Sequence, residues 1–240
     1  MFGQHIDTAP VLEAFALGGE CPLCALRDST ESGYLDQFLG GSVMEPSMRV
    51  LVNAKGFCAR HFSQLYAANN HLGVALMTHT HLKETISTLE KRWAEPKSGG
   101  LFDRFRKKSV EDESHRESHQ DSHRQSCALC ERLDATMDRY VKTVVWLWKN
   151  DLKFRERFNN SQGLCIEHAE AVLASSSDGA MRESLVKMEL DNLRRIEKEL
   201  EWFTLKFDYR NHDKPWGTSK DALPRAIQKL AGINLQIKGD

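Results

Sequence analysis

The chain has 240 residues, of which 40% are hydrophobic and 28% are charged, and its formal net charge is -1 at pH 7. A chain of this length can bury a real core as one large domain or two smaller ones, and its near-neutral charge gives no reason to expect nucleic acid as a partner. No run of 18 apolar residues predicts a membrane span, and the N-terminus lacks the basic and apolar regions of a secretory signal. We therefore expect a cytoplasmic protein that does not enter membranes.

Two patterns of cysteine and histidine each occur twice. CPLC (21–24) is followed by GFCARH (56–61), and CALC (127–130) is followed by GLCIEH (163–168). These four segments contain all six cysteines of the chain. The two stretches also align Leu23 with Leu129, Asp28 with Asp134, Tyr34 with Tyr140, Arg49 with Arg155 and Asn53 with Asn159. The pattern predicts an internal duplication.

Helical periodicity dominates both halves. Between CALC and GLCIEH, apolar residues at 133, 137, 140, 144 and 148 favour a helix over a strand. After each histidine the apolar spacing predicts the buried stripe of a long amphipathic helix. The first stripe contains Leu72, Leu76, His79, Leu82, Ile86, Leu89 and Trp93, and the second contains Val186, Leu190, Leu193, Ile196, Leu200, Phe203 and Phe207.

These elements predict an all-α protein of two pseudo-repeated halves, each organised around a tetrahedral metal site. We divide the chain into a first helical repeat (1–95), a charged linker (96–126), a second helical repeat (127–207) and a C-terminal capping segment (208–240). In the linker, His115, His119 and His123 could hold a metal weakly if they shared a helix face, but the composition favours a solvated tether. In the last segment, Thr218 and Asp221 resemble a capping box that opens a short helix, which we expect to pack across both halves.

Each half offers three cysteines and one histidine, the ligand number and type of a structural zinc site. The first predicted site is Cys21, Cys24, Cys58 and His61, and the second is Cys127, Cys130, Cys165 and His168. We expect the glycine before each third cysteine to allow a tight bend, and helices that begin at the motifs to stabilise the thiolates. The prediction is two zinc ions per chain. Iron-sulfur clusters and thiol or disulfide chemistry remain alternatives.

A few other residues are candidates for ligand binding. His79 lies on the first apolar stripe and is expected to be buried. Tyr209, Arg210, Trp216 and Lys220 belong to a polar and aromatic group that the second half does not share with the first. Packing is the simpler explanation for this group, but a ligand site confined to one half would draw on it.

The sequence also resembles a known family. The segments that carry the resemblance are the four cysteine motifs, LGVALMTHTHLKE (72–84) and LEWFTLKFDYRNHDKPWGTSKDALPRAIQKL (200–230). They are similar to those of an uncharacterised bacterial family found largely in anaerobic Gram-positive species, and the similarity covers nearly the whole chain outside 96–126. The resemblance implies no activity, substrate or partner. The anaerobic setting favours the iron-sulfur alternative somewhat.

No Ser-His-Asp set, carboxylate pair or glycine-rich phosphate loop indicates catalysis. We therefore hypothesise a zinc-stabilised, non-enzymatic binding or adaptor module with an unknown protein or small-molecule partner. One alternative is an iron-sulfur protein for electron transfer or redox sensing. The other is an enzyme whose site lies between the repeats near His79 and the C-terminal aromatic residues.

Overall fold

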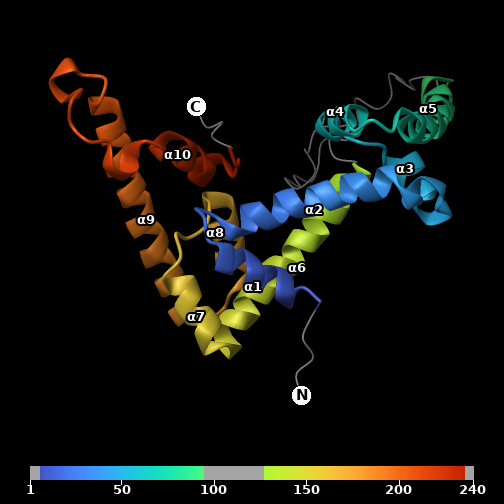
Figure 1. Cartoon of the computed structure of the whole chain (residues 1–240). Coiled ribbons are helices and arrows are strands. Elements are labelled where there is room, and N and C mark those ends of the chain that lie inside the picture. Colours follow the sequence, from blue (N-terminus) through green and yellow to red (C-terminus); the bar gives the residue numbers. More distant parts are fainter. Residues whose placement is uncertain (1–5, 95–126, 236–240) are drawn as a thin grey trace, which may run out of the picture. The chain divides into compact units, whose positions relative to one another are not determined.

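The computed structural model describes residues 6–94 and 127–235, and in that part of the chain it contains ten α-helices, three short 3-10 helices and no strand (Figure 1). The predicted all-α fold class is confirmed. The helices are α1 (Thr8–Leu17), α2 (Pro22–Leu39), η1 (Gly41–Met44), α3 (Pro46–Lys55), α4 (Ala59–Ala67), α5 (His71–Ala94), α6 (Ala128–Asn150), α7 (Leu152–Asn159), α8 (Ile166–Ser175), α9 (Gly179–Leu205), η2 (Tyr209–Asn211), η3 (Gly217–Ser219) and α10 (Ala222–Ala231). None of these helices is long and apolar enough to cross a membrane.

The chain forms two compact units whose boundary differs from that of the predicted repeats. The terminal unit consists of Met1–Glu31 and Leu133–Asp240, and the middle unit is Ser32–Arg132. Helix α2 begins in the terminal unit and ends in the middle unit, whereas α6 begins in the middle unit and ends in the terminal unit. The division into 1–95 and 127–207 therefore does not describe the compact units. The linker histidines His115, His119 and His123 lie outside the described residues.

The order of helices is the same in the two halves, and several local contacts recur. The Asn70 side chain accepts a hydrogen bond from the amide of Gly73 at the start of α5, and Asp178 accepts one from Met181 at the start of α9. Nearly three turns from the start of each helix, His81 of α5 lies against Gly56, and Glu189 of α9 lies against Gly163. These contacts match Asn70 with Asp178, Gly73 with Met181 and His81 with Glu189. They fix the register in which α5 and α9 can be compared.

In the terminal unit, an aromatic cluster joins α1 to α7. The ring of Phe15 lies 5.0 Å from that of Phe154 and 5.7 Å from that of Phe158, and all three side chains are buried. Helix α6 buries the five residues predicted from its periodicity, Leu133, Met137, Tyr140, Val144 and Trp148. The β-branched residues in YVKTVVWLW therefore do not prevent a helix, because its apolar face is covered.

In the middle unit, α3 packs against α5, and the ring of Phe57 contacts the rings of both Phe38 and Phe62. The face of α5 that packs against the unit carries Val74, Met77 and Thr80, and Thr80 accepts a hydrogen bond from Arg49. The predicted buried stripe of α5 is therefore wrong, and so is the predicted burial of His79. These residues lie on the opposite side of the helix and are exposed, apart from the partly buried Leu89.

The stripe predicted for α9 is only partly buried. Ile196 is buried, Leu193, Leu200 and Phe203 are half-buried, and Val186, Leu190 and Phe207 are exposed. The covering element is α10, which packs against α8 and α9. The predicted final helix thus exists, but its capping box does not: Asp221 occupies the N-cap position without a side-chain cap bond, and Thr218 donates to Glu199 instead.

The aromatic cluster should carry much of the stability of the terminal unit. We expect Phe158→Ala to lower the free energy of unfolding by about 3 to 5 kcal/mol, because the ring is fully buried and its removal leaves a cavity. Phe207→Ala is the matched control, since its ring is 77% exposed, and it should cost no more than about 1 kcal/mol. Urea unfolding of metal-loaded protein followed by circular dichroism measures both. Equal losses would contradict the described packing.

Candidate metal centres

The eight predicted ligands form two groups of four, but the partners differ from those expected. The terminal cluster contains Cys21, Cys24, Cys165 and His168, and the middle cluster contains Cys58, His61, Cys127 and Cys130. Within each group the ligand atoms all lie within 4.8 Å of one another. Each cysteine pair therefore meets the Cys-x-x-His element of the other half. The predicted sets, Cys21, Cys24, Cys58 and His61 and Cys127, Cys130, Cys165 and His168, are wrong as sets.

Helix length gives the physical reason for this exchange. Cys127 and Cys130 lie at the start of α6, which has 23 residues and is about 35 Å long at 1.5 Å per residue. Helix α7, which follows, has 8 residues and spans only about 12 Å. To bring Cys165 to its own cysteine pair, the chain would have to return along nearly the whole of α6 through α7 and residues 160–164, and in the structure it does not. The second cysteine pair therefore finds its partners elsewhere, and the complementary set remains for the first pair.

Each cluster lies at the N-terminal ends of two helices. The amide of Cys24 donates to the sulfur of Cys21 at the start of α2, and the amide of Cys130 donates to that of Cys127 at the start of α6, both at 3.4 Å. Cys165 is the N-cap residue of α8, and Cys58 is that of α4. The partial positive charge of a helix N-terminus stabilises a nearby thiolate. Both clusters are therefore built to hold negative sulfur.

The two glycines of the motifs have the conformation that the bend requires. Gly56 has φ of 61° and Gly163 has φ of 84°, in the region that side chains disfavour. There is also no room for a side chain: a Cβ on Gly163 would lie 2.6 Å from a carboxylate oxygen of Glu189, and one on Gly56 would lie 2.3 Å from the ring of His81. Glycine is therefore favoured at both positions for two reasons, the backbone conformation and the lack of space for a Cβ.

The spacing of the ligand atoms fits one small ion in each cluster. In the terminal cluster Nδ1 of His168 lies 3.4, 3.4 and 3.2 Å from the sulfurs of Cys21, Cys24 and Cys165. In the middle cluster Nδ1 of His61 lies 3.2, 3.2 and 3.4 Å from those of Cys58, Cys127 and Cys130. A tetrahedral zinc with its usual bond lengths separates sulfur from nitrogen by about 3.6 Å and sulfur from sulfur by about 3.8 Å. The sulfur pairs Cys24–Cys165 and Cys58–Cys130, at 3.5 and 3.9 Å, agree with the second distance.

The thiols of each cluster shift one another's proton affinity. Hydrogen bonds from Cys21 and Cys24 lower the pKa of the Cys165 thiol, while the bond to Cys165 raises the pKa of Cys24. In the middle cluster burial alone would raise the pKa of Cys127, but hydrogen bonds from His61 and from backbone amides lower it to about 6. Three thiolates so close together repel each other, and a divalent cation among them removes that repulsion.

Buried charges surround the terminal cluster. Glu20, next to Cys21, accepts two hydrogen bonds from Arg195 of α9 at 3.1 and 3.0 Å, and Arg225 of α10 lies 3.4 Å from it. Lys229 of α10 is 1% exposed, donates to the carbonyl of Leu164 at 2.9 Å and lies 3.6 Å from Glu189. Burial raises the pKa of Glu189 to about 7 despite this lysine. Helix α10 thus contacts both motifs of the cluster. One motif comes from each predicted half, so these contacts agree with the expectation that the last helix packs across both halves.

The middle cluster is more open. Cys58 and Cys130 are half-buried, whereas all three cysteines of the terminal cluster are buried. Its two motifs are tied by a backbone hydrogen bond of 3.0 Å from Ala128 to Gly56 and by an ion pair between Lys55 and Glu131. The end of α10 instead covers the terminal cluster, where Gly232 packs against the sulfurs of Cys24 and Cys165. The terminal cluster should accordingly exchange its ion more slowly.

No pattern in the sequence indicates which residues support the terminal cluster. Lys229 occupies an ordinary position in a short amphipathic helix, and Glu20 is one acidic residue among many. Nothing in their spacing indicates that both side chains are buried. Only the contact between α10 and the two motifs, which is distant in sequence, gives them their role.

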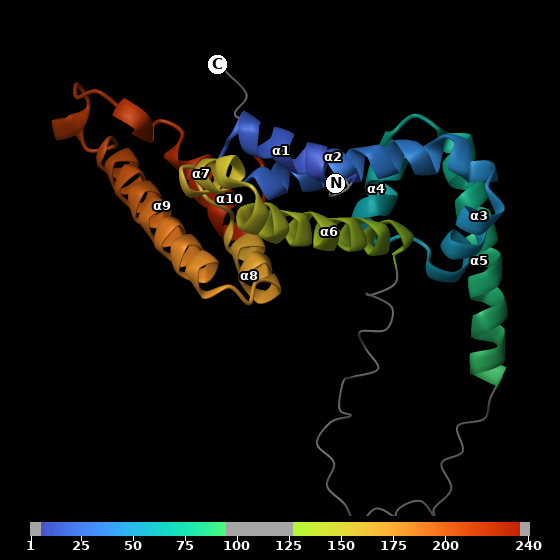
Figure 2. The same cartoon turned by 90° about the horizontal axis from the view of Figure 1, so that it is seen from below.

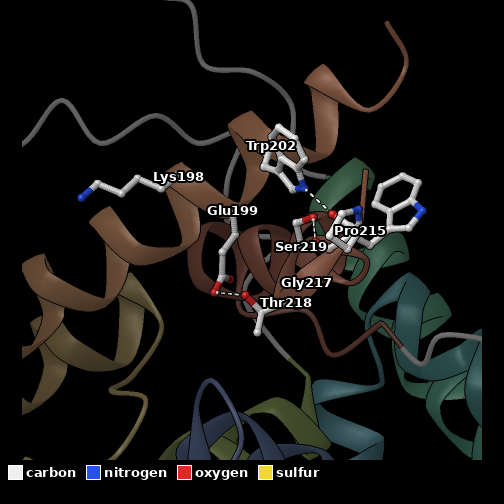
Figure 3. A pocket seen from close by; sticks show the side chains of 8 residues that line it. Lys198, Glu199, Trp202, Pro215, Gly217, Thr218 and Ser219 are labelled. Atoms are coloured by element: carbon white, nitrogen blue, oxygen red, sulfur yellow. Dashed lines mark hydrogen bonds between the residues drawn. The ribbon is translucent and has the colours of Figure 1, made fainter. Parts of the chain in front are cut away.

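The other predicted ligand-binding residues are scattered. His79 lies exposed on α5 of the middle unit, whereas Tyr209, Arg210 and Lys220 are exposed in the terminal unit. Trp216 is half-buried and lines a surface pocket of about 300 Å³. Figure 3 shows Thr218 bonded to Glu199 in this pocket and the indole of Trp202 bonded to the carbonyl of Pro215. The polar groups of the pocket are thus engaged with each other.

Comparison with known proteins places the chain in a family. The model of a family of unknown function, DUF6062, matches residues 2–236. The chain belongs to this family. It is also similar to an uncharacterised 23.9 kDa protein encoded in the xynA 3' region of Caldicellulosiruptor sp. (strain Rt8B.4), with 21% identity over 199 residues that cover 80% of this chain and 84% of that protein. No solved structure matches the chain significantly. The family resemblance seen in the motifs is confirmed.

The bend at Gly163 should be essential to the terminal cluster. We expect Gly163→Ala to lower the free energy of unfolding by about 1 to 3 kcal/mol, because the new methyl group meets Glu189 at a positive φ. Gly179→Ala is the matched control, since nothing lies within 4 Å of a Cβ there. Thermal unfolding of the metal-loaded variants compares them. A loss for Gly179→Ala as large as that for Gly163→Ala would contradict the steric argument.

The ligand pairing can be tested by counting ions. Cys24→Ser with His168→Ala removes two ligands of one cluster, so this double variant should bind one ion fewer than the wild type. Cys24→Ser with His61→Ala damages both clusters and should bind two fewer. Elemental analysis after dialysis against a weak chelator gives the ion content of each. If each half formed its own site, the order of the two variants would be reversed.

Proposed function

We propose that this protein is a zinc-stabilised, non-enzymatic binding module, in which one structural zinc ion in each unit joins two distant segments of the chain and an exposed helical surface binds a partner. The observation that carries the proposal is the pair of closed clusters. Each contains three cysteines and one histidine within 4.8 Å, and together they use every cysteine of the chain. Four protein ligands complete the tetrahedral shell of zinc, whereas catalytic zinc sites keep one position for water or substrate.

Zinc would contribute on the scale of the whole folding energy. Structural zinc in small modules has an apparent binding free energy of about 10 to 16 kcal/mol, while a domain is typically stable by about 5 to 15 kcal/mol. The terminal cluster links Cys24 to Cys165, which lie 141 positions apart, and the middle cluster links Cys58 to Cys130, which lie 72 apart. Each ion would thus close a long loop that the helices alone do not close.

An iron-sulfur cluster is the competing proposal for the same ligands. Such a cluster binds its ligands to different iron atoms, with bridging sulfides between them, so the protein ligands stand further apart than around one ion. Ligand atoms that all lie within 4.8 Å of one another, with some pairs as close as 3.2 Å, favour a single ion. Thiolate and imidazole ligands in a tetrahedron suit zinc best among the common ions. We place the protein in a reducing compartment, where such thiols stay available to a metal.

Removal of metal tests the proposal. Protein purified without a histidine tag should contain two zinc ions per chain and show no visible absorption. A strong chelator should remove the ion of the half-exposed middle cluster first and that of the terminal cluster later, and helical circular dichroism should fall with each loss. His61→Ala should lose one ion, and His79→Ala, an exposed histidine of the same unit, should lose none. Iron with sulfide and an absorption band near about 400 nm would instead make this a redox protein.

A further inference from the structure

Helix α5 carries a stripe of apolar side chains on the face that does not pack against its own unit. Its buried face contains Val74, Met77 and the half-buried Thr80 and His81. By the 3.6-residue repeat, the residues on the opposite face are His79, Leu82, Ile86, Leu89 and Trp93, here named the α5 stripe. Leu82 is 53% exposed, Ile86 48% and Trp93 73%. A contiguous exposed stripe of this size is the usual sign of an interaction surface.

Comparison with α9 shows that the scaffold does not require this stripe. In the register fixed by His81 and Glu189, Ile86 corresponds to Arg194, Leu89 to Glu197 and Trp93 to Glu201. The same face of the matched helix is therefore mostly charged, apart from Leu190 at the position of Leu82. Two helices that make the same contacts with their own units thus differ on the side that faces outward. The apolar residues of α5 serve something outside the middle unit's core.

The charges beside the stripe indicate what that partner is. Lys83 and Glu90 lie along one edge of the stripe, two turns apart, and the leucines Leu82 and Leu89 lie along the other edge. A helix that runs antiparallel to α5 with the same sequence would bring its own Glu90 to Lys83 and its own Lys83 to Glu90. In a parallel two-fold pair this edge would face the other edge of the partner helix, where Leu82 and Leu89 lie, so neither charge would meet an opposite charge. The edge is therefore complementary to itself in one orientation, as a two-fold symmetric interface requires.

We propose that the α5 stripe is the interface of a homodimer, in which the α5 helices of two copies pack antiparallel about Ile86. In this arrangement Ile86 meets Ile86 of the partner subunit, and Leu82 meets Leu89 of the partner subunit. His79 lies beside Trp93 of the partner subunit at each end, and two reciprocal Lys83–Glu90 pairs border the core. The C-terminal part of α5 extends beyond α3 (Figure 2).

This inference names the partner of the proposed binding module, but it does not depend on which metal the clusters hold. If the protein binds two zinc ions and is a monomer, the dimer fails and the zinc proposal stands. If it is a dimer that contains iron and sulfide, the zinc proposal fails and the dimer stands. Metal content and mass are separate readouts of the same sample.

Sedimentation velocity of the full metal-loaded chain over a range of concentrations tests the dimer. The wild type should be a dimer, and Ile86→Glu should be a monomer because it puts two carboxylates at the centre of the interface. Leu190→Glu, an exposed leucine on α9, is the matched control and should remain a dimer. Metal content at the wild-type level in all three shows that each variant is folded.

Charge reversal tests the antiparallel register. Lys83→Glu and Glu90→Lys should each raise the dimer Kd roughly tenfold, equivalent to about 1.4 kcal/mol, and both losses should shrink in high salt. The double variant restores opposite charges and should return the Kd to near the wild-type value. A monomeric wild type, an Ile86→Glu dimer, or a double variant no better than the single ones would overturn the proposal. Loss of a different bound protein by Ile86→Glu from a monomeric wild type would assign the stripe to that protein instead.

Discussion

The rigidity of the long helices is the constraint on which the rest of this structure depends. Because α6 carries the chain far from Cys127 and the helix that follows is short, each cysteine pair meets the Cys-x-x-His element of the other half. Each candidate metal centre therefore joins one segment from before residue 95 to one from after residue 126. The entropy of closing such long loops grows only slowly with their length. A tightly bound ion can offset this entropy cost. Each unit contains segments from both parts of the chain.

The two clusters have the same ligands but different surroundings, and the difference comes from α10. A buried lysine and a buried glutamate are costly unless each finds several partners. Lys229 has the carbonyl of Leu164 and the carboxylates of Glu189 and Glu20. Glu20 has Arg195 in addition. The network thus contacts both motifs of the terminal cluster. The motifs of the middle cluster are tied by one backbone hydrogen bond and one surface ion pair.

Local features of the structure could be predicted from the sequence, and features that depend on distant contacts could not. The helix at 133–148, the eight ligand residues and the bends at Gly56 and Gly163 all follow from neighbouring residues. The pairing of ligands did not, because a spacing between motifs along the chain says nothing of where they meet. Periodicity likewise showed that Leu82, Ile86 and Trp93 share a face of α5, but not whether that face is covered.

Helices α5 and α9 share local contacts but differ on their outward faces. The same local hydrogen bond recurs at the start of each helix, from the amide of Gly73 to Asn70 and from the amide of Met181 to Asp178. Residues on the outward face differ: α5 has Ile86 and Trp93 where α9 has Arg194 and Glu201. On the other side of α9, α10 adds the buried network that supports one metal centre. Helix α10 thus gives the terminal cluster a buried support, whereas α5 of the middle unit carries an exposed apolar surface.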